Sequence, residues 1–176
     1  MPEYIALLRA VNVGTKNRIT MEELRGIFAS KGYAHATTYL QSGNVRFSAK
    51  RGTRASVRRE IEEALSRRFK YETAAILRTP AELVRVVRAA PFGDRNWKGA
   101  APYITFLERA TRDVPPKKTP NGDLEVVHVE PAEVYSVARK VKGRSGNPNA
   151  FVEKHLKTRA TTRNWNVVRA LAEPPK

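Results

Sequence analysis

The spacing of apolar residues divides the first half of the chain into strand-like and helix-like segments. Residues 3–9 (EYIALLR) form a short apolar run rich in β-forming side chains, which predicts a buried strand. Residues 53–69 carry an apolar side chain at every fourth position, including Val57, Ile61 and Leu65, which predicts a helix with one buried face. The same reasoning predicts a helix over residues 21–32, a hairpin or bulged strand over 37–47, and a strand over 72–78.

Polar residues at two of the predicted helix starts support these boundaries. Thr20 precedes the helix of residues 21–32, and Glu23 follows three positions later, which is the spacing of a capping box. Thr79 and Glu82 repeat that spacing in the second half. Each pair indicates a helix whose first free N–H groups are bonded by side chains.

The second half repeats the rhythm of the first and indicates a fold class. It predicts helices over residues 79–90, 151–156 and 164–171, and strands over residues 102–108, 124–130 and 133–141. Strands and helices in this order are typical of an α+β protein in which helices cover mixed sheets. We divide the chain into a first half, residues 1–78, and a second half, residues 79–176, which ends in basic helices.

Composition excludes several classes of chemistry. The sequence has no cysteine, which excludes disulfides, thiol catalysis, cysteine-ligated zinc and iron–sulfur clusters. Its amino end lacks a basic segment, and its first apolar run is far shorter than a signal peptide or the roughly 20 residues of a spanning helix. We therefore expect a cytoplasmic protein that does not associate with a membrane.

Net charge is the strongest functional signal in the sequence. The chain carries +16, and residues 138–176 hold ten basic and two acidic side chains, so half of the excess lies there. Such asymmetry favours a basic face that attracts phosphates. The other interpretation is a general preference for arginine, with the charges serving as solvated surface.

The basic carboxy-terminal segment predicts binding of DNA or RNA. Phe151, His155 and Trp165 place aromatic rings among its cations, and such rings can stack on bases while cations neutralise phosphates. The residues that we expect to contact nucleic acid are Lys142, Arg144, Lys154, Lys157, Arg159 and Arg163.

The segment ATTRNWNVV, which begins at Ala160, combines a structural and a functional expectation. Thr161 or Thr162 is a suitable N-cap, and the spacing that follows places Trp165 on the buried face of a helix. Arg163 would then lie in the first helical turn, where a cation does not complement the helix dipole. We therefore expect it to have an anionic partner, either the Glu153 carboxylate or an external phosphate.

Two loops of the first half form a second candidate site, in which a phosphate-bearing small molecule would bind in a cleft. The loop of residues 9–18 leads from a strand into a helix N-terminus, a position that favours anions, although it contains no Walker or GxGxxG motif. The turn of residues 41–44 has a glycine that permits a bulge or a close backbone approach. The candidate ligands of these loops are Arg9, Asn12, Lys16, Ser42 and Asn44; Asn12 could equally fasten its own loop, and the turn could be purely structural.

Catalytic signatures are weak in this sequence. A nucleophilic Ser42 would need a nearby base, and none of His35, His128 and His155 lies in a recognisable triad context. No HExxH motif or carboxylate cluster occurs, and His128 and Glu130 would share the solvent face of a strand. We expect no metal and no cofactor.

Several longer segments resemble a known bacterial family. The runs LLRAVNVG, YLQSGNVRF, APF, FVEKHL and ATTRNWNVV are similar to the family called domain of unknown function 1697, along nearly the whole chain, with Ala10 where a glycine is common. The resemblance implies two ferredoxin-like α/β subdomains and assigns no activity. Nucleic-acid binding is our leading interpretation; an enzyme acting on a small molecule or nucleotide phosphate, and a non-catalytic protein-interaction domain, stay open.

Overall fold

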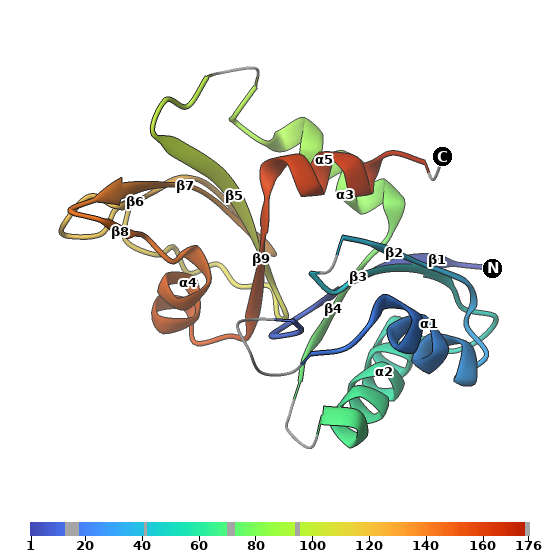
Figure 1. Ribbon diagram of the computed structural model, residues 1–176. Helices are drawn as coiled ribbons and strands as arrows, with labels where there is room; N and C mark the ends of the chain where they lie inside the picture. The colour runs from blue at the N-terminus through green and yellow to red at the C-terminus, as the bar shows by residue number, and fades with distance from the viewer. Residues whose placement is uncertain (13–17, 41, 70–72, 94–95, 175–176) are drawn as a thin grey trace. The chain divides into compact units, whose positions relative to one another are not determined.

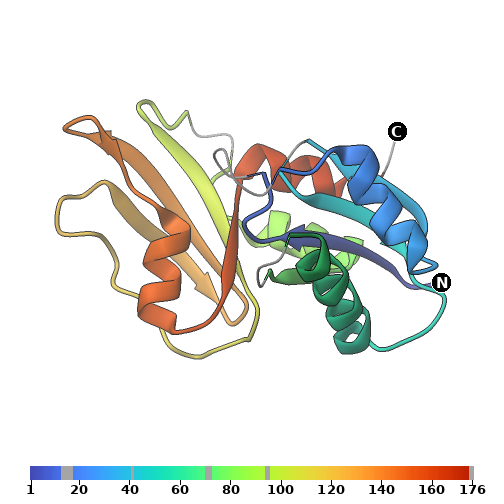
Figure 2. The ribbon, with the colours of Figure 1, turned by 60° about the horizontal axis from the view of Figure 1, so that its bottom comes forward.

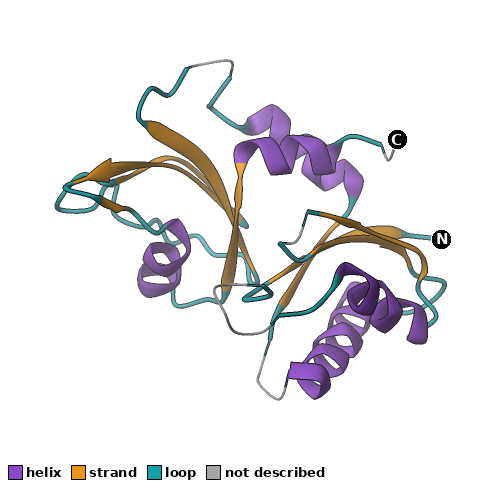
Figure 3. Cartoon of the chain, in the orientation of Figure 1, coloured by secondary structure: helices purple, strands orange, loops and turns teal. Residues whose placement is uncertain are grey.

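The computed structural model of this protein describes residues 1–12, 18–40, 42–69, 73–93 and 96–174. The chain forms two compact units, Met1–Glu82 and Leu83–Lys176. The described residues form five helices and two main antiparallel sheets, which confirms an α+β fold (Figure 3). Every pair of neighbouring strands in these two sheets is antiparallel, so neither sheet is mixed as the sequence had predicted.

The first unit is a ferredoxin-like βαββαβ domain. Its elements are β1 (Glu3–Leu8), α1 (Met21–Ser30), β2 (Ala34–Tyr39), β3 (Asn44–Ser48), α2 (Arg54–Phe69) and β4 (Ala75–Arg78). The strands lie in the order β2-β3-β1-β4, and both helices cover the same face of the sheet (Figures 1 and 2). This order makes β1 a central strand, in agreement with its continuous apolar sequence.

Two helices, α1 and the next helix after α2, begin where the capping pairs predict. The Glu23 amide donates to Thr20 Oγ1 over 3.1 Å, and the Thr20 amide donates to Glu23 Oε2 over 3.1 Å. A second reciprocal pair joins Thr79 and Glu82, at 2.8 and 3.2 Å, and opens α3 (Pro80–Ala89). Each cap satisfies two donors that a helix cannot bond itself and stabilises its helix by about 1 kcal/mol.

The core of the first unit lies between these two helices and the sheet. Val57, Ile61 and Leu65 are buried, which confirms the predicted apolar face of α2. From α1, Phe28 packs edge-on against Phe47 of β3, with ring centroids 5.0 Å apart. Fully buried aromatic rings of this kind each contribute a few kcal/mol, so they fix the helices on the sheet.

Alternating strand directions gather the loops of this unit at two opposite ends of the sheet. The end of β1 is bonded to the β2–β3 turn through Leu8 N and Gly43 O (2.8 Å), and to the start of β4 through Arg9 N and Ala74 O (2.8 Å). The connections that follow α1 and β3 lie at the opposite end. The two loops proposed as a ligand site therefore do share one end of the sheet.

The second unit repeats this strand order but has no helix between its first two strands in the described residues. Its further elements are β5 (Ala100–Leu107), β6 (Leu124–Glu130), β7 (Glu133–Val141), β8 (Arg144–Ser145), α4 (Pro148–Leu156), β9 (Ala160–Asn164) and α5 (Trp165–Ala172). The order β6-β7-β5-β9 matches that of the first unit, with residues 108–123 in place of its first helix. One face of this sheet is covered by α4, through Val152 and Leu156 (Figure 1).

Aromatic rings form a second core in this unit. Phe92 is fully buried, and its ring centroid lies 5.4 Å from that of Trp165 and 6.2 Å from that of Tyr135. Trp165 is 8% exposed, which confirms that it belongs to the core. No helix in the described residues is long and apolar enough to cross a membrane.

The start of the last helix differs from the sequence-based expectation. Residues 160–164 form strand β9, and the N-cap of α5 is Asn164 rather than Thr161 or Thr162. Pairing with β5 decides the outcome, since Thr162 lies opposite Thr105 and their hydroxyl oxygens are 2.8 Å apart. A β-branched side chain suits such a ladder better than a helix turn.

Candidate functional site

A tight hairpin at the end of β7 exposes the first group of predicted cations. Lys142 and Gly143 both have positive φ, 49° and 78°, as a two-residue hairpin turn requires. Lys140, Lys142 and Arg144 are exposed, and no carboxylate in the described part of the chain pairs with them. Arg139, by contrast, lies 3.6 Å from the Glu125 carboxylate.

The second group of cations lies at the carboxyl end of α4. Asn147 caps the start of this helix by accepting from Ala150 N over 3.0 Å, and Lys157 ends it in the left-handed conformation, with φ 51°. Lys154 and Lys157 are exposed and, among the described residues, have no carboxylate partner. Cations here also complement the helix dipole, so they stabilise α4 whether or not they bind a ligand.

An aromatic pair lies beside these lysines on the same helix. The ring centroids of Phe151 and His155 are 4.6 Å apart, and the rings are inclined by 55°. Phe151 is half-buried against the core of the second unit, whereas His155 is exposed. The fixed Phe151 ring therefore supports an imidazole that is open to solvent.

Arg159, a predicted ligand of nucleic acid, is held within the protein. Its Nε and Nη2 donate to the two carboxylate oxygens of Glu108, over 2.7 and 2.9 Å. Glu108 is nearly buried, with a side chain 10% exposed, so this bidentate pair is screened less than a surface ion pair. The charge of Arg159 is therefore neutralised locally.

Arg163 does not lie in a helical turn, and that expectation is wrong. It is part of β9, opposite Ile104, and is 8% exposed. Its Nη1 donates to Thr161 Oγ1 over 2.7 Å and to the Thr162 carbonyl over 2.9 Å. Burial lowers the pKa of Arg163 to about 10. Its side chain is therefore removed from any exposed basic surface.

In the first unit, Asn12 fastens its own loop. Its Oδ1 accepts from Ile19 N over 2.8 Å, and its Nδ2 donates to Ile19 O over 3.0 Å. Asn12 and Ala10 both have positive φ, 54° and 59°, which explains why a glycine would suit position 10. Lys16 lies outside the described residues. The side-chain amide of Asn12 therefore closes the loop, as the structural alternative proposed.

The turn between β2 and β3 uses its polar groups in the same way. Asn44 is fully buried and donates to Tyr39 O over 3.0 Å and to Ser42 Oγ over 2.8 Å. A Cβ atom at Gly43 would lie 3.0 Å from Leu8 Cβ, so the predicted close backbone approach is confirmed. The register irregularity of this hairpin lies in β2, between Ala34 and Thr37, and not at Ser42. Gln41 lies outside the described residues.

The backbone of Arg9 completes this cluster of fastened loops. The Arg9 carbonyl accepts a hydrogen bond from Thr73 Oγ1 over 3.1 Å, beside the bond that its amide donates to Ala74. The segments that follow β1, join β2 to β3 and precede β4 thus form hydrogen bonds with one another or within themselves. These hydrogen bonds give the side-chain amides of Asn12 and Asn44 a structural role.

The histidines show no catalytic arrangement in the described residues. His128 Nε2 lies 2.8 Å from Glu130 Oε1, as expected for two side chains on one face of a strand. His35 is the second residue of β2, at the end of the first sheet opposite Ser42. In the described ranges, no three His, Asp or Glu side chains are grouped to hold a metal ion.

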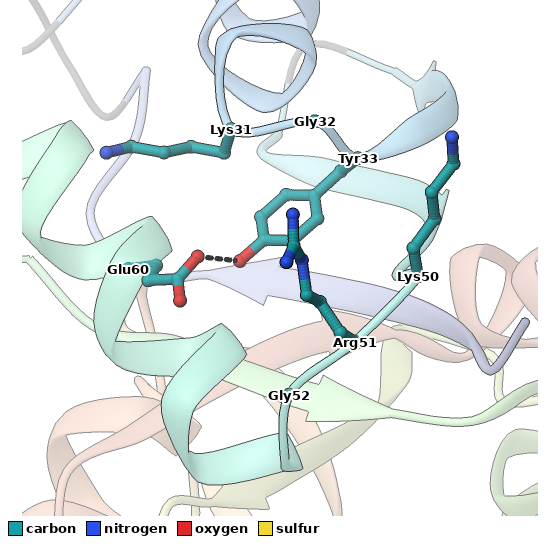
Figure 4. Close-up of a pocket in the computed structure, with 7 residues that line it drawn as sticks. All are labelled: Lys31, Gly32, Tyr33, Lys50, Arg51, Gly52 and Glu60. Atoms are coloured by element: carbon teal, nitrogen blue, oxygen red, sulfur yellow. Dashed lines mark hydrogen bonds between the residues drawn. The ribbon is translucent and has the colours of Figure 1, made fainter.

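Sequence reasoning missed a polar hollow in the first unit (Figure 4). It has a volume of about 420 Å³, and its lining residues are Lys31, Gly32, Tyr33, Lys50, Arg51, Gly52 and Glu60. These residues come from separate segments, none of which carries a motif. The ferredoxin-like strand order was the available signal, since it places the connections after α1 and β3 at one end of the sheet.

Comparison with known proteins identifies a family and a shared fold. The model of a family described as protein of unknown function (DUF1697) matches residues 1–135, a range that ends before FVEKHL and ATTRNWNVV. No curated protein matches the sequence. Among solved structures, the conserved bacterial protein SP0830 from Streptococcus pneumoniae is 17% identical, with 98% of this chain and 97% of that chain covered and a TM-score of 0.70. At this identity the likeness shows the fold alone.

Proposed function

The chain belongs to the DUF1697 family of proteins of unknown function, so its activity has to be inferred from its own residues, and we propose that it binds nucleic acid. The proposed contact surface is a set of five exposed cations in and beside the β7–β8 hairpin and at the end of α4, which we call the basic surface. It consists of Lys140, Lys142, Arg144, Lys154 and Lys157.

The observation that carries this proposal is that these cations have no carboxylate partner among the described residues, whereas neighbouring arginines do. Arg139 is paired with Glu125 and Arg159 with Glu108, yet no described carboxylate pairs with any member of the basic surface. Unpaired cations gather counterions, and exchange of those ions for phosphates drives association with nucleic acid. A polyanion is therefore the partner class that this charge distribution favours.

The arrangement of the basic surface supports contact with more than one phosphate. The hairpin cations precede α4 in the sequence, and Lys154 and Lys157 lie in its last turn and at its C-cap; the nine-residue helix is itself about 13 Å long. Beside them, the exposed His155 ring, supported by Phe151, can stack on an unpaired base. Such contacts are independent of sequence and suit single strands of DNA or RNA. The cytoplasmic location predicted from sequence would give access to both.

Fluorescence anisotropy with labelled single- and double-stranded DNA and RNA tests this proposal. We expect affinity to fall log-linearly with salt, and the double variant Lys142→Ala, Arg144→Ala to reduce the salt slope by about 2. Lys154→Ala, Lys157→Ala should act similarly. The control is Arg59→Ala, Arg67→Ala, which removes two exposed cations from α2, of which Arg67 lies 3.9 Å from the Glu63 carboxylate, and should leave the slope unchanged. Equal losses in control and test variants would refute a defined basic surface.

The alternative site at the loops of residues 9–18 and 41–44 has less support from the structure. The side-chain amides of Asn12 and Asn44 are bonded to groups of their own loops. These bonds give both residues a structural function, so we carry the loop interpretation no further.

A further inference from the structure

The hollow of the first unit is lined by one held carboxylate and by three cations that have no carboxylate partner among the described residues (Figure 4). Lys31 comes from the turn after α1, and Lys50 and Arg51 come from the loop between β3 and α2. Glu60 lies on α2, and the ring of Tyr33 lies between it and Arg51 in the view of Figure 4. Segments distant in the sequence thus line one hollow; in Figure 4 the Arg51 side chain reaches over the Tyr33 ring, whereas the Lys31 and Lys50 side chains extend outward in different directions.

Tyr33 makes the floor of this hollow rigid. Its ring is 6% exposed and packs against Phe47, with centroids 5.1 Å apart, and against Phe28, with centroids 6.2 Å apart. Its hydroxyl donates to Glu60 Oε2 over 2.7 Å. Burial, with the neighbouring Glu60 carboxylate, raises the pKa of Tyr33 well above its usual range, so the hydroxyl stays a donor. The position of the Glu60 carboxylate is therefore fixed.

The cations of the hollow differ from those around them. Nearby on α2, Arg54 is paired with Glu82 at 2.9 Å and Arg58 with Glu62 at 4.0 Å. Lys31, Lys50 and Arg51 have no carboxylate partner anywhere in the described residues. With three cations and Glu60 as the one carboxylate that lines it, the hollow is net positive, so an anion that entered it would be attracted. The charge pattern thus favours an anionic ligand.

We propose that this hollow binds a small phosphomonoester that also carries hydroxyl groups. A volume of about 420 Å³ suits a small molecule, since ligand pockets measure roughly 300–1,000 Å³. The guanidinium of Arg51 and the ammonium groups of Lys31 and Lys50 match phosphate oxygens. Glu60, anchored through Oε2, can accept from a ligand hydroxyl, and its charge disfavours a purely anionic ligand. This site is in the first unit, so it does not rest on the basic surface of the second.

Titration of the full-length protein by ¹H–¹⁵N NMR tests the proposal. The probes are glycerol 3-phosphate, inorganic phosphate and glycerol, and the reporters are the amides of Gly32 and Gly52, which line the hollow. We expect glycerol 3-phosphate to shift both amides and to bind more tightly than inorganic phosphate, while glycerol does neither. No shift by about 10 mM glycerol 3-phosphate, a concentration that would reveal even weak millimolar binding, would overturn the proposal.

Variants then assign the contacts. Lys50→Ala, Arg51→Ala should weaken binding of glycerol 3-phosphate at least about tenfold, since it removes two charge-assisted contacts. Glu60→Gln should reduce the preference for glycerol 3-phosphate over inorganic phosphate. The charge-matched control Arg59→Ala, Arg67→Ala should leave both affinities unchanged, and equal weakening by this control would overturn the site.

The same variants separate this proposal from nucleic-acid binding. Lys50→Ala, Arg51→Ala should retain the anisotropy response to nucleic acid, while Lys142→Ala, Arg144→Ala should retain the NMR response to glycerol 3-phosphate. Loss of the NMR response in the second variant would contradict a site confined to the hollow. Each proposal can therefore fail without the other.

Discussion

Replacement of Asn44 by alanine separates a structural role of the β2–β3 turn from a role in ligand binding. In the folded protein, the Asn44 amide donates to Tyr39 O and Ser42 Oγ over 3.0 and 2.8 Å, from a fully buried position. Each bond contributes about 1 kcal/mol, and the truncated side chain leaves a small void. We therefore expect Asn44→Ala to lower the free energy of unfolding by about 2–3 kcal/mol.

This loss should be visible in both global and local measurements. For a unit of this size, 2 kcal/mol corresponds to a fall in Tm of roughly 8–16 °C, measurable by far-UV circular dichroism. Hydrogen exchange should also accelerate in peptides that span β2 and β3. The control is Ser42→Ala, which removes one acceptor at an exposed position and should lose about 1 kcal/mol or less. An Asn44→Ala protein within 0.5 kcal/mol of wild type, a change typical of a surface substitution, would refute the structural role.

Three further substitutions test other contacts. Gly43→Ala should lower the free energy of unfolding, measured by urea denaturation, by roughly 2–4 kcal/mol, because φ at Gly43 is +71° and the added Cβ would lie 3.0 Å from Leu8 Cβ. An unchanged free energy of unfolding would contradict the close approach. Glu108→Gln should lower the free energy of unfolding by about 1–2 kcal/mol, and it should tighten nucleic-acid binding because it releases the Arg159 guanidinium. An unchanged free energy of unfolding would show that the ion pair does not stabilise the fold. Burial acts to raise the pKa of Glu82, but hydrogen bonds to the carboxylate outweigh it, so the pKa lies below 4.5. Its stabilisation is present above pH 4.5 and is lost as the pH falls through the lowered pKa, so Glu82→Gln should flatten that acid-range decline in Tm.

Local sequence signals predicted the parts of the fold that depend on local interactions. The fourth-position repeat of Val57, Ile61 and Leu65 identified the buried face of α2, and the capping pairs located two helix starts. In both cases the deciding contacts lie within one helix or on one side of it. Such patterns can be recognised from the sequence because helix periodicity and capping involve residues that are close together along the chain.

The segment around Arg163 shows where local reasoning ends. Its threonines are good caps in isolation, but pairing with β5, far away in the sequence, makes them part of β9. Residue type alone also failed to identify which cations are available to a ligand. Arg159 and Arg163 form hydrogen bonds within the fold, whereas Lys142 and Lys154 have no carboxylate partner among the described residues. Which arginines remain available is a property of tertiary structure.

The hollow around Tyr33 was hidden for the same reason. Lys31, Lys50 and Glu60 lie in segments that carry no motif, and only the strand order of the first unit brings them together. A sequence argument that first fixed the ferredoxin-like order could have grouped these loops. It would not have found the bond between Tyr33 and Glu60, which depends on the packing of α2 on the sheet.

The strand order has a consequence for synthesis on the ribosome. In each sheet the first strand to emerge, β1 or β5, becomes a central strand whose two partners are made later. Pairing between distant segments is slow, so each of these apolar strands waits in an unpaired state during translation. The first unit can close once β4 has emerged, whereas the second needs β9, near the carboxyl terminus. A nascent chain stalled before β9 would expose an edge of β5, and chaperone capture of such chains should cease once that strand is complete.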